Sequence, residues 1–124
     1  MKQHILVVDD EKPICDLLSS FFRKRGYEVT TAATATEALR LADEVALHLM
    51  ILDIALADAD GLELLVRIKN AHPNLPVIIL TGMGFDDELL QEALQKKASG
   101  YVSKTLPLEQ LLLEVRRVLK QAGA

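Results

Sequence analysis

The chain has 124 residues, half of them apolar, which is enough for a domain with a buried core and argues against disorder. Eighteen acidic and 14 basic residues give a net charge of −4, without the basic face that nucleic-acid binding requires. No apolar run is long enough to span a membrane, and there is no secretory signal and no disulfide partner for Cys15, so we expect a cytoplasmic protein that contacts neither membrane nor nucleic acid.

Short apolar runs alternate along the chain with amphipathic runs that have the period of a helix. The expected strands are His4–Val8, Tyr27–Ala32, Leu49–Leu52, Val77–Leu80 and Tyr101–Ser103. The expected helices are Pro13–Arg25, a segment from Thr34 or Thr36 to about Val45, a segment marked by Leu62, Leu65 and Ile68 that ends near Pro73, Asp86–Lys97 and Pro107–Gln121. The third and fourth strands are apolar throughout, which indicates burial on both faces. We therefore expect a parallel sheet covered by helices, in a single domain over residues 1–124.

Local signals indicate where several helices begin and end. Pro13 suits the first turn of the first helix, and Gly26 follows its last turn. The helix Asp86–Lys97 has acidic residues in its first turn and lysines in its last, as the helix dipole favours. Asp60, directly before Gly61, is expected to be a turn or capping residue. These signals predict helix boundaries that a structure can test.

Polar residues follow four of the five expected strands. Asp9 and Asp10 follow the first strand, Asp53 the third, Thr81 the fourth and Lys104 the fifth. In a parallel sheet these ends share one edge, where open α/β sheets bind ligands. Neighbouring carboxylates there would repel one another by roughly 3–4 kcal/mol per pair at an effective dielectric near 20, and Lys104 offsets only one charge. The pattern therefore predicts a Mg²⁺ site, beside a carboxylate that could attack phosphorus and form an aspartyl phosphate.

Four motifs in chain order carry a resemblance to a known family. They are VVDDE at residues 7–11, MILDIALADADGLELL at 50–65, PVIILTG at 76–82 and GYVSK at 100–104. Over essentially its whole length the chain resembles the receiver domain of bacterial two-component response regulators. The resemblance implies a doubly wound, flavodoxin-like sheet of five parallel strands in the order 2-1-3-4-5, with five helices on its two faces.

The resemblance also implies a phosphorylation switch rather than an enzyme. A sensor histidine kinase would transfer a phosphoryl group to Asp53 in the presence of Mg²⁺ or Mn²⁺. By the pattern of the family, Asp10 and Asp53 would bind the metal directly, and Asp9 would do so largely through water. The backbone carbonyl of Ala55 would be a further metal ligand. The expected chemistry is therefore transfer of a phosphoryl group to one carboxylate of an acidic cluster.

The remaining expected site residues hold the phosphoryl group or transmit its presence. Thr81 and Lys104 would hold the phosphoryl oxygens, and Tyr101 would turn inward as Thr81 moves. This movement would reshape the surface of the fourth helix, fifth strand and fifth helix. A downstream output domain or target protein would read that surface, and a homodimer could form through it.

Two side chains are expected to set the lifetime of the phosphorylated state. Ala55 lies two residues after Asp53, and Met83 lies two residues after Thr81. In this family these two positions flank the phosphoryl group. Neither alanine nor methionine can hydrogen-bond an attacking water, and Met83 could shield the group from water. The hypothesis that follows is a long-lived phosphorylated state.

The chain departs from the family pattern in two loops. Leu56-Ala57 stands where the family often has Met-Pro, which loosens the loop slightly. Thr105 follows Lys104, where the family usually has a proline joined by a cis bond, and Pro107 comes later. A cis bond before a non-proline residue costs about 2.5–4 kcal/mol. We expect a cis Lys104-Thr105 bond despite this cost; the alternative is a trans loop from which Lys104 reaches the site differently.

Three other functions fit parts of this pattern. A Mg²⁺-dependent phosphohydrolase of the haloacid dehalogenase type would need a second aspartate at position 55, which is Ala55 here, and a cap domain. A flavodoxin-like cofactor binder would need a Gly- and hydroxyl-rich phosphate loop after the first strand, where this chain has acidic residues. A degenerate receiver would fold without being phosphorylated; the five intact site residues argue against it, and Thr105 leaves it open.

Overall fold

The computed structural model describes residues 2–56, 58–82 and 86–123, in which strands and helices alternate. The strands are β1 (His4–Val8), β2 (Glu28–Ala32), β3 (Leu49–Asp53), β4 (Val77–Thr81) and β5 (Gly100–Ser103). The helices are α1 (Lys12–Arg23), α2 (Ala35–Glu44), α3 (Gly61–Ala71), α4 (Asp87–Gln95) and α5 (Leu108–Gln121). Every expected element is present, with several ends moved by one or two residues. Within the described ranges, none of the helices has the length and apolar character needed to cross a membrane.

All five strands are parallel and lie in the order β2-β1-β3-β4-β5, which confirms the expected topology. The register pairs Val8 at the end of β1 with Leu52 near the end of β3. It also pairs Thr81, the last residue of β4, with Ser103, the last residue of β5. The carboxyl ends of β1, β3, β4 and β5 therefore lie next to one another at one edge of the sheet.

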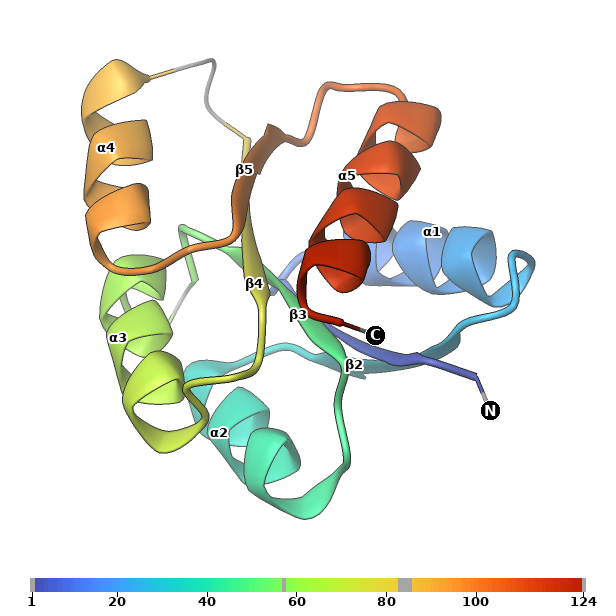
Figure 1. Cartoon of the computed structure of the whole chain (residues 1–124), viewed down its shortest axis with the longest axis horizontal. Helices are drawn as coiled ribbons and strands as arrows, with labels where there is room; N and C mark the ends of the chain where they lie inside the picture. Colours follow the sequence, from blue (N-terminus) through green and yellow to red (C-terminus); the bar gives the residue numbers. More distant parts are fainter. Residues whose placement is uncertain (1, 57, 83–85, 124) are drawn as a thin grey trace.

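Helices cover both faces of the sheet (Figure 1), with α1 and α5 on one face and α2, α3 and α4 on the other. Because side chains alternate along a strand, β1 contributes to two separate cores. Ile5 and Val7 pack with apolar residues of α1 and α5, whereas Leu6 and Val8 pack with those of α2, α3 and α4. Every residue of β3 and β4 is buried, as expected for strands with helices on both faces.

The ends of α1 and α2 follow from local contacts. α1 begins at Lys12, one residue before the expected start, and ends at Arg23, before Gly26 takes a positive φ of 92°. Glycine adopts this left-handed conformation without steric strain, so it suits the turn into β2. Thr34, rather than Thr36, caps α2, because its side chain accepts a hydrogen bond from the backbone N–H of Glu37.

α4 is shorter than expected at both ends. Asp86 is its capping residue and accepts hydrogen bonds from the next turn, so the helix itself begins at Asp87. At the other end Lys96 caps the helix, and Lys97 has a φ of +72°, which is incompatible with a further helical turn. The prediction that the two lysines occupy the last helical turn is therefore wrong; they directly follow it.

Candidate phosphoacceptor and metal site

Five polar residues that follow or end the strands meet at one edge of the sheet. Asp9 and Asp10 directly follow β1, Asp53 and Thr81 are the last residues of β3 and β4, and Lys104 directly follows β5. Asp9, Asp53 and Thr81 are almost completely buried and account for three of the four buried polar or charged residues in the described chain. Burial of polar groups is unfavourable unless they are paired, so their concentration at one edge indicates a site.

Three carboxylates in this cluster could share one cation. Asp9, Asp10 and Asp53 each offer an oxygen within 4.8 Å of the others, and Asp10 alone is exposed to solvent. Hard divalent cations such as Mg²⁺ bind carboxylate and carbonyl oxygens together with water. The donor set and its close spacing therefore fit a divalent cation that solvent can reach from the side of Asp10.

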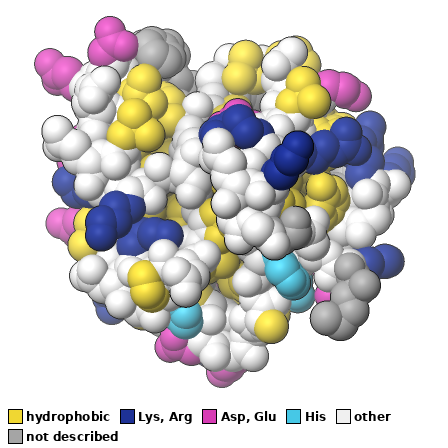
Figure 2. All heavy atoms as spheres, in the orientation of Figure 1, with side chains coloured by type: hydrophobic (Ala, Val, Ile, Leu, Met, Phe, Trp, Pro, Cys, Tyr) yellow, Lys and Arg dark blue, Asp and Glu magenta, His cyan; other side chains and the backbone are white. Residues whose placement is uncertain are grey.

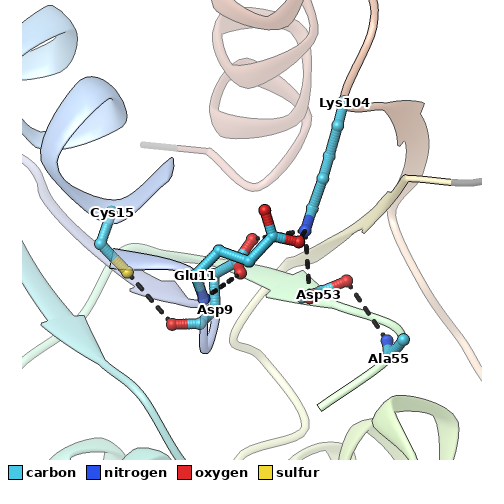
Figure 3. A network of polar contacts seen from close by, with 6 residues as sticks. All are labelled: Asp9, Glu11, Cys15, Asp53, Ala55 and Lys104. Atoms are coloured by element: carbon cyan, nitrogen blue, oxygen red, sulfur yellow. Dashed lines mark hydrogen bonds and ion pairs between the residues drawn. The ribbon is translucent and has the colours of Figure 1, made fainter. Parts of the chain in front are cut away.

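The ammonium group of Lys104 enters this acidic cluster (Figure 3), and its side chain is 11% exposed. Its Nζ atom lies 2.9 Å from Oδ2 of Asp9 and 3.2 Å from Oδ2 of Asp53. Burial by itself would lower the pKa of Lys104, but the hydrogen bonds and charges of the two aspartates outweigh it and raise the pKa above its ordinary value. Lys104 is therefore held as a cation beside the candidate acceptor.

Burial changes the acidity of the Asp53 carboxyl group. Its pKa is raised above the ordinary value, first because burial disfavours the charged form and then because the carboxylate of Asp9 is close. The backbone N–H of Ala55, which donates to Oδ1 at 3.2 Å, and the ammonium of Lys104 act in the opposite direction. Oδ1 and Oδ2 thus have separate partners, one from the following loop and one from the end of β5.

The loop between β3 and α3 folds back against the end of β3. Ala55 pairs with Asp60 in an antiparallel bridge, and the N–H of Gly61 donates to the carbonyl of Ile54 at 2.9 Å. A Cβ atom at Gly61 would lie 2.6 Å from the carbonyl oxygen of Asp53, which is a steric clash with backbone. Glycine is therefore required where α3 approaches the acceptor strand.

Two aspartates of the same loop accept hydrogen bonds from the first turns of helices. Asp60 accepts a hydrogen bond from the N–H of Leu62 at 2.9 Å, which confirms the expectation that it is a capping residue. Both carboxylate oxygens of Asp58 lie 3.1 Å from the backbone nitrogen of Ala35, the first residue of α2. Hydrogen bonds to α2 and α3 thus hold the loop without the proline that the family often has. Ala57 lies outside the described residues.

The expectation of a cis Lys104-Thr105 bond is wrong, because the described chain contains no cis peptide bond. Trans is the favoured geometry before a residue that is not proline. The turn after β5 is instead stabilised by Ser103, whose Oγ accepts a hydrogen bond from the N–H of Thr105 at 3.2 Å. The N–H of Lys104 donates to the carbonyl of Thr81 at 2.7 Å, so the trans loop still directs the lysine into the site.

Two further site residues expected from the sequence lie on β4 and β5. Thr81 is completely buried at the end of β4. Tyr101 is partly buried on β5, opposite Ile79 of β4, and packs with the apolar cluster formed with α2, α3 and α4. Its side chain thus lies on the same face of the sheet as α4. Met83, expected to affect the phosphoryl lifetime, lies outside the described residues.

Sequence reasoning missed two contacts of this site. Oε1 of Glu11 lies 3.2 Å from Nζ of Lys104, although 93 residues separate them (Figure 3). The thiol of Cys15 donates to the backbone carbonyl of Asp9 at 3.2 Å, and its pKa is raised, first by burial and then by the charge of Asp9. Glu11 belongs to the VVDDE motif, but nothing in the motif indicated its partner.

Known proteins resemble this chain over nearly its whole length. Residues 5–116 match the family model of the response regulator receiver domain. The uncharacterized transcriptional regulatory protein YkoG of Bacillus subtilis is 36% identical over 122 residues, which are 98% of this chain and 53% of YkoG. The TcrX protein of Mycobacterium tuberculosis, named a probable transcriptional regulatory protein, is 30% identical over 96% of this chain and 50% of its own length. The chain thus spans about half the length of these relatives.

Solved structures show the same fold. A response regulator receiver domain protein (CheY-like) from Methanospirillum hungatei matches with a TM-score of 0.93 at 30% identity, over 99% of this chain and 98% of that one. The receiver domain of NtrX from Brucella abortus matches with a TM-score of 0.88 at 38% identity, over 94% of this chain and 98% of that one. The similarity therefore covers the whole sheet and the helices on both of its faces.

Proposed function

The chain belongs to the response regulator receiver domain family of two-component systems, and on that premise we propose that Asp53 accepts a phosphoryl group from a sensor histidine kinase. Receiver domains act as phosphoacceptor switches rather than as classical enzymes. One observation carries the proposal: Asp53 is a buried carboxylate with an ammonium group at 3.2 Å and two further carboxylates beside it. This arrangement provides a nucleophile, a fixed positive charge and a cation site together.

The proposed reaction transfers one phosphoryl group without a redox change. A carboxylate oxygen of Asp53 attacks phosphorus, and the P–N bond to the kinase histidine breaks. The imidazole nitrogen keeps the bonding electron pair and takes up a proton, while Asp53 becomes an acyl phosphate. Lys104 stays charged and stabilises the negative charge on the phosphoryl oxygens, and the hydroxyl of Thr81 donates to one of them.

The acidic cluster would hold Mg²⁺ or Mn²⁺. Asp10 and Asp53 would bind the cation directly, Asp9 largely through water, and Ala55 through its backbone carbonyl. When bound, the cation supplies positive charge that balances the aspartates and the incoming phosphoryl group. The burial of Asp9 and Asp53 supports this assignment, because Lys104 alone leaves the cluster with excess negative charge.

The proposed output involves Thr81, Tyr101 and the surface of α4, β5 and α5. Thr81 would move toward the phosphoryl group, and Tyr101 would turn inward behind it. Helices α4 and α5 flank β5, and hydrophobic side chains are exposed over both helices on this face (Figure 2). Leu94 of α4 and Leu113 of α5 are 47% and 58% exposed, which suits recognition by another protein. We propose that an output domain, a target protein or a second copy of the chain binds here.

The phosphorylated state is proposed to be long-lived. Ala55 and Met83 would flank the phosphoryl group, and neither side chain can orient a water for attack on phosphorus. The measurement is the decay of the phosphorylated protein with no phosphatase present. Replacing Ala55 with asparagine, which can hydrogen-bond a water, should shorten the lifetime. A wild-type lifetime of only seconds would contradict the proposal.

Intact-mass spectrometry tests the proposed function. After incubation with acetyl phosphate and Mg²⁺, the protein should gain the mass of one phosphoryl group, and removal of Mg²⁺ by a chelator should prevent the gain. Asp53→Asn should abolish it, whereas the matched Asp58→Asn change in the same loop should leave it unchanged, since Asp58 contacts the backbone of Ala35. A chain that never gains the phosphoryl group would be a degenerate receiver, and the proposal would be wrong.

A further inference from the structure

Glu11 occupies the capping position of α1, but its side chain makes no capping hydrogen bond. Glutamate is not among the residues favoured at this position. Its backbone is nevertheless held firmly: the N–H donates to Oδ1 of Asp9 at 2.9 Å, and the carbonyl accepts from the N–H groups of Ile14 and Cys15. The backbone of Glu11 thus begins the helix, while its side chain extends to Lys104 instead.

Lys104 has three carboxylate partners: its ammonium group donates hydrogen bonds to Glu11 and Asp53 and forms an ion pair with Asp9. Two of the partner side chains are buried, Asp9 at 0% and Asp53 at 3% exposure, whereas Glu11 is 60% exposed. Figure 3 shows the Glu11 carboxylate beside the lysine nitrogen. Glu11 is therefore the partner that can leave Lys104 without leaving a buried charge unpaired, because its carboxylate can be solvated by water.

We propose that Glu11 is an exchangeable partner of Lys104 and that the Glu11 carboxylate accepts a hydrogen bond from one N–H of the ammonium group until a phosphoryl oxygen replaces it. This inference rests on the proposed function and adds a positioning residue to it. A phosphoryl group that approaches Asp53 needs one N–H of Lys104 and is itself anionic. The Glu11 carboxylate competes with it for the lysine and also repels it.

The negative charge of Glu11 should have opposite effects on the binding of the divalent cation and of the anionic phosphoryl donor. It adds a negative charge beside Asp9, Asp10 and Asp53, so it should strengthen cation binding while it weakens entry of an anionic donor. Exposed ion pairs contribute about 0.2–1 kcal/mol, which corresponds to changes of roughly 1.4- to fivefold in an equilibrium constant. Loss of the charge should therefore strengthen binding of the phosphoryl donor and weaken binding of the cation. A general loss of structure would weaken both.

The experiment compares Glu11→Gln with Asp16→Asn, which removes the same charge from the same helix. Asp16 is 65% exposed and pairs with Lys12 at 3.0 Å rather than with Lys104. Phosphoryl uptake is measured against acetyl phosphate concentration at saturating Mg²⁺, and Mg²⁺ affinity is measured by calorimetry on the unphosphorylated protein. Glu11→Gln should lower the half-saturating acetyl phosphate concentration about two- to fivefold and weaken Mg²⁺ binding about twofold, and Asp16→Asn should change both by less.

Glu11→Asp separates contact with Lys104 from charge alone, because it keeps the charge on a side chain one methylene shorter. It should lower the half-saturating acetyl phosphate concentration and leave Mg²⁺ affinity close to that of the wild type. If Glu11→Asp behaved like the wild type in both assays, the proposed exchange with Lys104 would be wrong. Equal effects of Glu11→Gln and Asp16→Asn would also contradict it. If the wild type took up no phosphoryl group, the proposed function itself would be wrong, and the role proposed for Glu11 would fall with it.

Discussion

Replacing Lys104 with methionine removes the ammonium group from the carboxylates of Asp9 and Asp53. These two groups stay buried, with oxygens within 4.8 Å of each other. At an effective dielectric of about 20 their repulsion at this distance is about 3–4 kcal/mol. Removing one partner of a buried ion pair generally costs about 3–5 kcal/mol, which is the same range. We therefore expect Lys104→Met to lower the free energy of unfolding by about 3–5 kcal/mol at neutral pH without divalent cations.

The loss of stability in Lys104→Met should depend on divalent cations and on pH. Burial raises the pKa of Asp53, so the folded protein binds this proton more tightly than the unfolded chain does. Stability contributed by this group therefore increases as the pH falls through the folded pKa and decreases as the pH rises. Without Lys104 this pKa should rise further. Addition of Mg²⁺, or a fall in pH below neutral, should thus restore part of the lost stability.

Urea unfolding followed by circular dichroism measures this effect, and Lys69→Met is the matched control. Lys69 is also partly buried, and burial lowers its pKa, but its ammonium donates to the neutral carbonyls of Pro73 and Leu75 at 2.9 and 2.8 Å. Its removal should lower stability relative to the wild type by an amount that stays the same when Mg²⁺ is added, because the site at the strand ends is unchanged. If Lys104→Met were as stable as the wild type, or if Mg²⁺ left its deficit relative to the wild type unchanged, the electrostatic account of the site would be refuted.

Three other predictions concern single residues. Gly61→Ala places a Cβ atom against the backbone of Asp53 and should lower the free energy of unfolding by about 1–3 kcal/mol and slow phosphorylation, as measured by urea unfolding and intact mass. Thr34→Ala should cost about 1 kcal/mol through loss of the α2 cap, with unchanged phosphoryl uptake; reduced uptake would contradict the local role of this cap. Burial raises the pKa of the Cys15 thiol, so iodoacetamide should modify the native protein slowly and the urea-unfolded chain rapidly; fast native labelling would contradict its burial.

Several features of the fold and of the candidate site could be predicted because simple periodicities determine them. Asp9, Asp53 and Lys104 come together because they end or follow parallel strands, whose carboxyl ends share one edge. The apolar runs of β3 and β4 predicted burial on both faces, and every residue of these strands is buried. The Mg²⁺ site was predicted from the carboxylates at the strand ends, whereas the mode in which each ligand binds the metal and the switch roles of Thr81 and Tyr101 came from the resemblance to receiver domains. All of these stay predictions.

Other features depend on contacts that no local pattern contains. The ion pair between Glu11 and Lys104 joins residues 93 positions apart and requires both side chains to extend over the same edge. The contact of Asp58 with the first turn of α2 likewise depends on how the loop packs, so composition could not predict it. The cis bond before Thr105 was transferred from a family pattern based on proline, and without proline the trans geometry prevails.

The central claim is that Asp53 is the residue that carries the phosphoryl group. Borohydride reduces an acyl phosphate of aspartate to homoserine, so peptide mapping after reduction of the phosphorylated protein locates the group directly. We predict homoserine at position 53, dependent on Mg²⁺ and on prior incubation with the phosphoryl donor. Homoserine at Asp9, at Asp10 or at another acidic residue, with Asp53 unmodified, would contradict the account.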